Sequence, residues 1–228
     1  MKSLFNLDNP FMQILSRIAD MMFINILTIL CSLPVITIGA AFTANHKVMQ
    51  NIVMDEEKPL FRSYFHSFRI NFKQATIVWL FLLLFMSSVV CSLILITAHF
   101  EGTFATILYL CIGILALLVV GVCSYLFPLI ARYDNTLREH LHNATLLVIM
   151  KMHKTLLLLV LNGVPLILFL ISTRLFLDSL IIWVLVGFSL MIYLCNYFLK
   201  PVFVGLENSQ KAAAVCAEDE ADTLSTEA

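Results

Sequence analysis

Charged residues are scarce in this chain. Of its 228 residues only 13% are Asp, Glu, Lys or Arg, whereas 61% are hydrophobic and 18 are phenylalanine. Soluble globular domains are about a quarter charged and about half apolar. The composition therefore excludes an ordinary soluble domain. The formal net charge of −1 also argues against a chain that binds nucleic acid through an excess of positive charge.

Motifs that mark enzymes and cofactor sites are missing as well. The sequence contains no Walker A motif, no G-x-G-x-x-G and no H-E-x-x-H. None of its six cysteines forms a C-x-x-C pair. No carboxylate lies centrally within an apolar run, and no serine there has a nearby base. We therefore expect a protein that is not an enzyme, uses no cofactor and holds no metal.

What the sequence does have is long apolar runs. Five runs without Asp, Glu, Lys or Arg are between 19 and 30 residues long: 21–46, 74–100, 102–131, 155–173 and 179–199. A helix crosses a bilayer core with about 20 residues, and the runs lack the alternation of barrel strands. These runs predict an all-α, polytopic membrane protein with five spans, at about 18–42, 75–98, 103–131, 155–173 and 179–199.

The end of the chain differs from the rest. The last 21 residues hold five carboxylates and no aromatic side chain. A segment of this composition buries too little apolar surface to offset the entropy of ordering. We therefore predict one helical membrane domain over residues 1–207 and a disordered acidic cytoplasmic tail over residues 208–228.

Lysine and arginine are distributed unevenly between the predicted connections. Eleven lie in the connections 47–73 and 132–154 or after residue 199, and three lie in the other set. Cytoplasmic connections of membrane proteins carry the excess of Lys and Arg. Because five spans place the termini on opposite sides, we expect the N-terminus outside and the C-terminus in the cytoplasm.

Pro34 interrupts the first apolar run, within the segment CSLPVITIGA at residues 31–40. Proline inside a helix removes a backbone donor and clashes with the carbonyl four residues earlier. Two interpretations stay open. Residues 21–42 cross once with a kink, or a helix over about 14–33 is followed by a second helix over about 35–54 that lies along the cytoplasmic face or re-enters.

Two residues after the proline are expected to repair the break. Thr37 can hydrogen-bond a carbonyl that Pro34 leaves free. Gly39 belongs to a small-residue pattern that lets two helix backbones approach closely. The segment therefore predicts a break joined to a helix-packing face.

A few polar residues lie at the edges of the runs or inside them. Arg17 and Asp20 are three residues apart and can pair on one helix face. Asn25, Asn162 and Asn196 lie within apolar segments. Asparagine in a membrane helix commonly hydrogen-bonds between helices. We expect these three to join helices, with contact to a substrate as the alternative.

An amphipathic helix is predicted over residues 59–73, with the sequence PLFRSYFHSFRINFK. Aromatic residues recur on one face, and Arg62, Arg69 and Lys73 recur on another. Such a helix lies at a membrane interface, with rings toward the acyl chains and cations toward anionic headgroups. The alternative is that this surface docks another subunit.

Two segments resemble the YesL family of bacterial integral membrane proteins. The first has Asp20 and Asn25 in a D-x(4)-N arrangement, followed by CSLPVITIGAAFTA. The second resembles the pattern F-x-x-F-x-x-N-F-K-Q, with Asn71 and Lys73 among its members. Close similarity covers residues 9–80, a looser one covers 128–150, and the acidic tail has no counterpart.

The resemblance implies a place in the bacterial cell membrane and an accessory role. Family members are encoded beside carbohydrate-uptake genes, which implies a transporter permease or a membrane sensor as the partner. It implies no catalytic residue. The expected function is thus a non-enzymatic component of carbohydrate uptake or its regulation; the alternative is a small-solute transporter or channel that acts as an oligomer.

Overall fold

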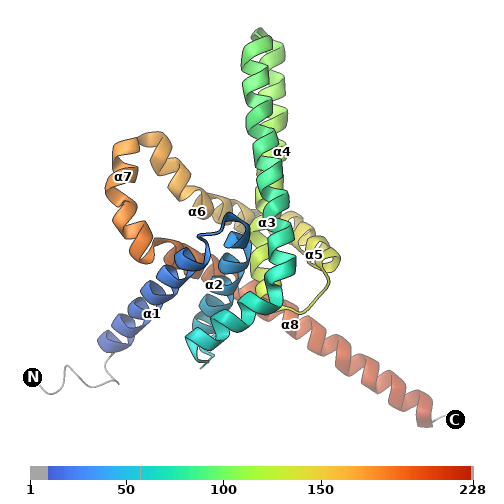
Figure 1. Ribbon diagram of the computed structural model, residues 1–228. Helices are drawn as coiled ribbons and strands as arrows, with labels where there is room; N and C mark the ends of the chain where they lie inside the picture. Colours follow the sequence, from blue (N-terminus) through green and yellow to red (C-terminus); the bar gives the residue numbers. More distant parts are fainter. Residues whose placement is uncertain (1–9, 57, 227–228) are drawn as a thin grey trace, which may run out of the picture.

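A computed structural model describes residues 10–56 and 58–226, and every regular element in these ranges is a helix, without any strand (Figure 1). The all-α prediction is confirmed. The elements are α1 (Pro10–Cys31), the 3₁₀ turn η1 (Val35–Thr37), α2 (Ile38–Val53), α3 (Leu60–His99), α4 (Gly102–Arg132), α5 (Leu137–Met150), α6 (Met152–Ile171), α7 (Thr173–Ile182), the π-helical segment η2 (Trp183–Gly187) and α8 (Phe188–Thr226).

Five helical segments are long and apolar enough to cross a membrane, which confirms the predicted membrane class. They are Ile14–Cys31, Leu60–His99, Gly102–Arg132, Met152–Ile171 and Thr173–Asn208. The first of them ends at Cys31, so the predicted span over 18–42 is corrected at both ends.

Pro34 separates two helices rather than bending one. Helix α1 ends at Cys31, Pro34 has extended backbone angles (φ −74°, ψ 119°), and α2 begins at Ile38 after the turn η1. The loss of the proline N–H and the clash of its ring explain why the first helix stops just before this point. Of the two interpretations, the one with a second helix after the break is correct.

Helix α2 returns alongside α1. The guanidinium of Arg17, near the start of α1, lies 2.9 Å from the carboxylate of Asp55, just after the end of α2. The start of one helix and the end of the other are therefore neighbours. In place of one helix over 18–42, α1 and α2 form a helical hairpin that turns at Pro34.

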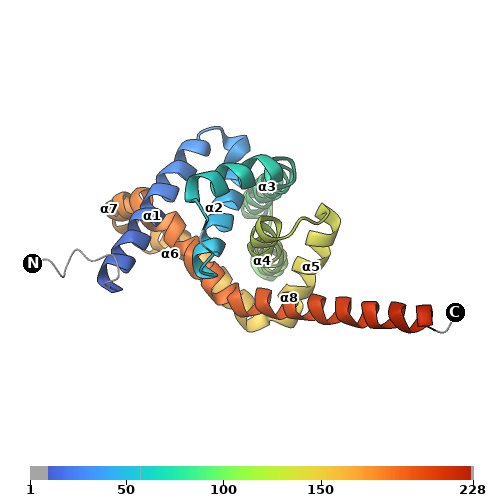
Figure 2. The ribbon, with the colours of Figure 1, turned by 90° about the horizontal axis from the view of Figure 1, so that it is seen from below.

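Helix α2 occupies the centre of the molecule. It packs against α1, α3, α4 and α8, and Figure 2 shows it between α1 and α3. Twelve of its 16 residues are buried. Its small residues, including Ala40, Ala41 and Ala44, are fully buried, which lets neighbouring helix backbones approach.

The predicted amphipathic helix is the beginning of α3. Helix α3 is continuous over 40 residues, from Leu60 to His99. At 1.5 Å per residue its length is about 60 Å, roughly twice the thickness of a bilayer core. Figure 1 shows its first turns at an angle to the rest. The segment 59–73 is therefore not a separate element, although its position before the apolar part agrees with the prediction.

Helices α3 and α4 form a hairpin that extends away from the other helices (Figure 1). The hairpin turns at Phe100 and Glu101, and Gly102 has the positive φ of 71° that favours glycine. Most of the apolar side chains beyond Trp79 on α3 and before Gly121 on α4 are exposed or half-buried. The chain itself leaves much of this surface uncovered.

The acidic tail differs from its prediction. Helix α8 continues to Thr226, whereas composition predicted disorder from residue 208. Alanine and glutamate, which are frequent here, have high intrinsic helix propensity, and that favours extension of α8. Residues 1–9 of the predicted membrane domain and residues 227–228 of the predicted tail lie outside the described residues.

Candidate functional site

The π-helical segment η2 is clamped by Asn25. The Nδ2 of Asn25 donates to the carbonyls of Trp183 at 3.0 Å and Val184 at 2.7 Å. Its Oδ1 accepts from the backbone N–H of Ser189 at 2.9 Å. A π-helical turn disrupts the regular i to i−4 pattern, so backbone groups there need other partners. Asn25 supplies them from α1 and so joins α1 to η2 and the start of α8.

A second buried contact joins α1, α2 and α8. The Nδ2 of Asn45 donates to the hydroxyl of Thr28 at 3.1 Å and to that of Ser189 at 2.9 Å. The Thr28 hydroxyl in turn donates to the carbonyl of Ile24 at 2.7 Å. All three polar side chains are almost fully buried. These bonds tie the central helix to two neighbours.

A third chain of hydrogen bonds has a fixed direction. The Nε2 of Gln50 donates to the carbonyl of Pro128 at 2.9 Å and to Asn196 Oδ1 at 3.2 Å. The Nδ2 of Asn196 then donates to the carbonyl of Ile192 and to His46 Nδ1, the latter at 3.0 Å. Since an amide NH₂ only donates, His46 Nδ1 must accept. The neutral ring therefore carries its proton on Nε2.

The turn at Pro34 satisfies its own backbone. The hydroxyl of Thr37 lies 2.6 Å from the carbonyl of Cys31 and 2.7 Å from that of Pro34. The Nε1 of Trp79 donates to the carbonyl of Val35 at 2.8 Å. Thr37 thus lies within hydrogen-bond distance of two carbonyls of the turn. A turn whose carbonyls are bonded in this way is compatible with a place inside the bilayer.

Gly39 lies at the closest approach of α2 and α3. A Cβ added there would lie 2.4 Å from the carbonyl oxygen of Ala75 and 2.6 Å from the Cβ of Trp79. Such distances do not occur between real atoms, so only glycine fits. Gly39 thus lies where the backbones of α2 and α3 approach closely.

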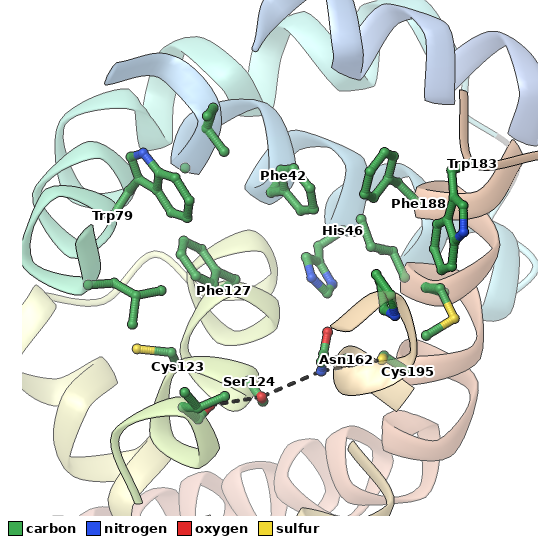
Figure 3. A pocket seen from close by; sticks show the side chains of 17 residues that line it. Phe42, His46, Trp79, Cys123, Ser124, Phe127, Asn162, Trp183, Phe188 and Cys195 are labelled. Carbon is green, nitrogen blue, oxygen red and sulfur yellow. Dashed lines mark hydrogen bonds between the residues drawn. The ribbon is translucent and has the colours of Figure 1, made fainter. Parts of the chain in front are cut away.

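A cavity of about 350 Å³ opens where α2, α3, α4, α6 and α8 meet (Figure 3). Aromatic side chains form much of its wall, and His46, Ser124 and Asn162 are polar groups in its lining. Pockets that bind small molecules have this composition: mainly apolar, with a few polar groups at defined places. This cavity and the polar contacts around His46 are the candidate site.

A layer of charges closes the other end of α2. Arg132 lies 2.8 Å from a carboxylate oxygen of Glu56 and 2.9 Å from one of Glu207. Lys58 also bonds Glu56, and the Nζ of Lys200 donates to the carbonyl of Val53 at 2.8 Å. Burial raises the pKa of Glu56, but the bonds from Lys58 and Arg132 outweigh it and hold that pKa below its ordinary value.

The basic face at the start of α3 is exposed as predicted. Arg62, Arg69 and Lys73 are exposed, and no ion pair involves them among the described residues. Asn71 donates to the hydroxyl of Ser67 at 3.1 Å within the same helix.

The prediction that the aromatic face of the same segment contacts acyl chains is wrong in part. Tyr64 is fully buried, and Phe65 and Phe68 pack against the same cluster of α1 and α2 side chains, whereas the acyl chains were the expected contact. Phe61 and Phe72 remain exposed. The reason is the hairpin of α2 and α3, which turns this face toward protein.

Asp20 does not have its expected partner. Arg17 pairs with Asp55 instead, and the described contacts include no ion pair or hydrogen bond of the Asp20 carboxylate. Among the residues that the structure describes, no group of three His, Cys, Asp or Glu side chains could hold a metal ion.

Sequence reasoning missed three residues of the site: Asn45, His46 and Gln50. They lie just after the predicted span over 18–42, so they were not counted among the polar groups expected to join helices. The available signal was the run of small residues before them, from Gly39 to Ala44, which is typical of a closely packed helix.

Comparison with known proteins gives one match. A family model described as "Protein of unknown function, DUF624" matches residues 21–96, which cover the second half of α1, all of α2 and nearly all of α3. No curated protein and no solved structure matches the chain. Gly39, Asn45 and His46 all lie within the matched range. Residues 21–96 are therefore similar to DUF624, a family whose function is unknown.

Proposed function

We propose that this chain is a non-enzymatic accessory protein of the bacterial cell membrane that acts in carbohydrate uptake or its regulation. In this proposal it binds a carbohydrate-transporter permease in the plane of the membrane. The link to carbohydrate uptake comes from the resemblance to the YesL family. Asn25 and Asn71, which are among the residues that carry this resemblance, lie within the range that matches DUF624.

The observation that carries the proposal is the α3–α4 hairpin. Leu84 is 71% exposed and Ile94 62% on α3, and Leu110 is 61% exposed on α4. In a bilayer, van der Waals packing between helices drives association, since lipid tails are as apolar as leucine. The outer parts of these two long spans leave apolar side chains exposed, which offers a surface on which the helices of a permease can pack in the same way.

The proposed role includes no catalytic step. The buried amide side chains of Asn25, Asn45, Gln50 and Asn196 donate to backbone carbonyls or to buried side chains of neighbouring helices. Groups used in this way hold helices together.

We further propose that both termini lie in the cytoplasm, in place of the opposite sides expected from five successive crossings. The Arg17–Asp55 contact supports this, because it puts the start of α1 beside the basic connection that follows α2. With Lys2 and Arg17 on that side, thirteen of the fourteen Lys and Arg residues lie in the cytoplasm, with Arg174 as the exception. The charge asymmetry becomes stronger than with the N-terminus outside.

Co-purification tests the proposed partner. The tagged chain, expressed at its native level, is extracted in mild detergent, and the bound proteins are identified by mass spectrometry. We expect a carbohydrate-transporter permease, and recovery of this chain alone would contradict the proposal. Leu84→Trp on the hairpin should reduce the permease yield, whereas Leu170→Trp on α6, at a position with 74% exposure, should not.

A further inference from the structure

Two polar atoms face the cavity without a protein partner. The Nδ1 of His46 is occupied by Asn196, so the Nε2–H is left as a donor at the cavity wall. The Nδ2 of Asn162 donates to the carbonyl of Leu158 at 2.9 Å, and it lies 3.5 Å from the Ser124 hydroxyl. No hydrogen bond to Asn162 Oδ1 occurs among the described residues, so this oxygen is left as an acceptor.

The donor and the acceptor belong to different helices but to the same space. His46 comes from α2 and Asn162 from α6, and Figure 3 shows the Asn162 oxygen directed toward the His46 ring. A hydroxyl group can both donate and accept through its single oxygen atom. A ligand hydroxyl between the two side chains would satisfy both of them.

The rest of the wall is apolar. Phe42, Trp79 and Phe127 line one part, and Trp183 and Phe188 line another (Figure 3). Burying a hydroxyl group without a hydrogen bond is unfavourable. A free sugar, with its several hydroxyls, would leave most of them unpaired in this cavity. The wall suits a molecule whose remaining atoms are apolar.

We propose that the cavity binds an uncharged lipid alcohol, whose hydroxyl lies between His46 and Asn162 and whose apolar body contacts the aromatic wall. The volume of about 350 Å³ is at the lower end of small-molecule pockets, so the cavity holds the hydroxyl end and the first part of the chain. This site does not depend on the proposed role in carbohydrate uptake.

Tryptophan fluorescence offers a direct test, because the chain has only two tryptophans and both line the cavity. The full chain in phosphatidylcholine nanodiscs is titrated with 11-bromo-1-undecanol, whose bromine quenches nearby indoles. 1-Bromoundecane, which lacks the hydroxyl, is the matched control. We expect saturable quenching by the alcohol, and only weak, non-saturating quenching by the alkane at equal concentration in the bilayer.

Three variants distinguish binding in the cavity from general partitioning of the alcohol into the bilayer. Asn162→Leu removes the acceptor and should weaken apparent affinity about five- to tenfold, the expected effect of one lost hydrogen bond. Val120→Phe fills the cavity without changing a polar side chain and should abolish saturable quenching. Thr97→Val, at an exposed position remote from the cavity, should change nothing.

Three results would overturn the proposal. The first is equal quenching by alcohol and alkane, which would mean that any acyl chain fills the space. The second is saturable quenching that persists in the Val120→Phe variant. The third is a larger fluorescence change with a free sugar than with the alcohol, which would assign the cavity to a polyhydroxylated ligand.

Discussion

In a soluble protein a helix rich in polar side chains would face the solvent and an apolar hairpin would be buried. Helix α2 and the α3–α4 hairpin show the reverse. Helix α2 carries Asn45, His46 and Gln50, and all three are buried. The hairpin carries mainly apolar side chains, and Leu84 and Leu110 are among many that are exposed. The polar helix is inside and the apolar helices are outside.

The difference shows which property governs position in a bilayer. Because lipid is as apolar as leucine, burial of apolar side chains does not select the central helix. Small residues and hydrogen-bonding groups do, since they allow close approach and need partners. Hydropathy therefore identifies the helices that face lipid, and it overlooks a helix such as α2.

The largest effect is expected where α2 touches α3. Gly39→Leu cannot fit, since even a Cβ would meet the Ala75 carbonyl at 2.4 Å. We expect the variant to lose about 3 kcal/mol or more of folding free energy, or to fail to fold. Thermal unfolding in detergent, followed by gel filtration, measures this. Gly113→Leu on the hairpin, with no atom within 4 Å of an added Cβ, should be tolerated.

A smaller loss is expected from Asn25→Ala. It removes three hydrogen bonds to the backbone around η2. Interhelical hydrogen bonds in membranes contribute about 0.6 kcal/mol each, which gives about 2 kcal/mol in total. The same unfolding measurement tests this, with Asn143→Ala on α5 as the control. An Asn25 variant as stable as that control would show that the π-helical segment does not need its clamp.

The smallest effect is expected in the charge layer. Glu56 has its pKa held below the ordinary value by Lys58 and Arg132, against the effect of burial. A depressed pKa contributes stability at neutral pH that is lost as the pH falls below about 4.3 and through the folded-state value. Arg132→Met should cost about 1 kcal/mol at pH 7 and should flatten this acid-side decline. Unfolding midpoints measured from pH 7 to pH 3 test both effects.

Much of the architecture follows from local sequence. The charge-free runs predict the apolar spans, because in lipid each helix must satisfy its backbone alone. The chemistry of Pro34, Thr37 and Gly39 is also local: a lost donor, a hydroxyl and a missing Cβ. Their roles could be stated before the structure was known.

The site could be predicted only in part. Asn25 and Asn162 were recognisable as polar groups in apolar segments, but the carbonyls that Asn25 bonds lie 158 and 159 residues away in sequence. The pairing of Arg17 with Asp55 depends on the direction in which α2 runs. Spacing in the sequence favoured a pair of Arg17 with Asp20 instead, because spacing relates only residues of the same helix.

The central claim is that α2 brings the chain back to the side on which α1 began. Fusion of green fluorescent protein or alkaline phosphatase to the N-terminus of the full chain tests it directly, with C-terminal fusions as the reference. We predict that both green fluorescent protein fusions fluoresce and that both phosphatase fusions are inactive, as expected for two cytoplasmic termini. An active N-terminal phosphatase fusion, together with an inactive C-terminal one, would contradict the account.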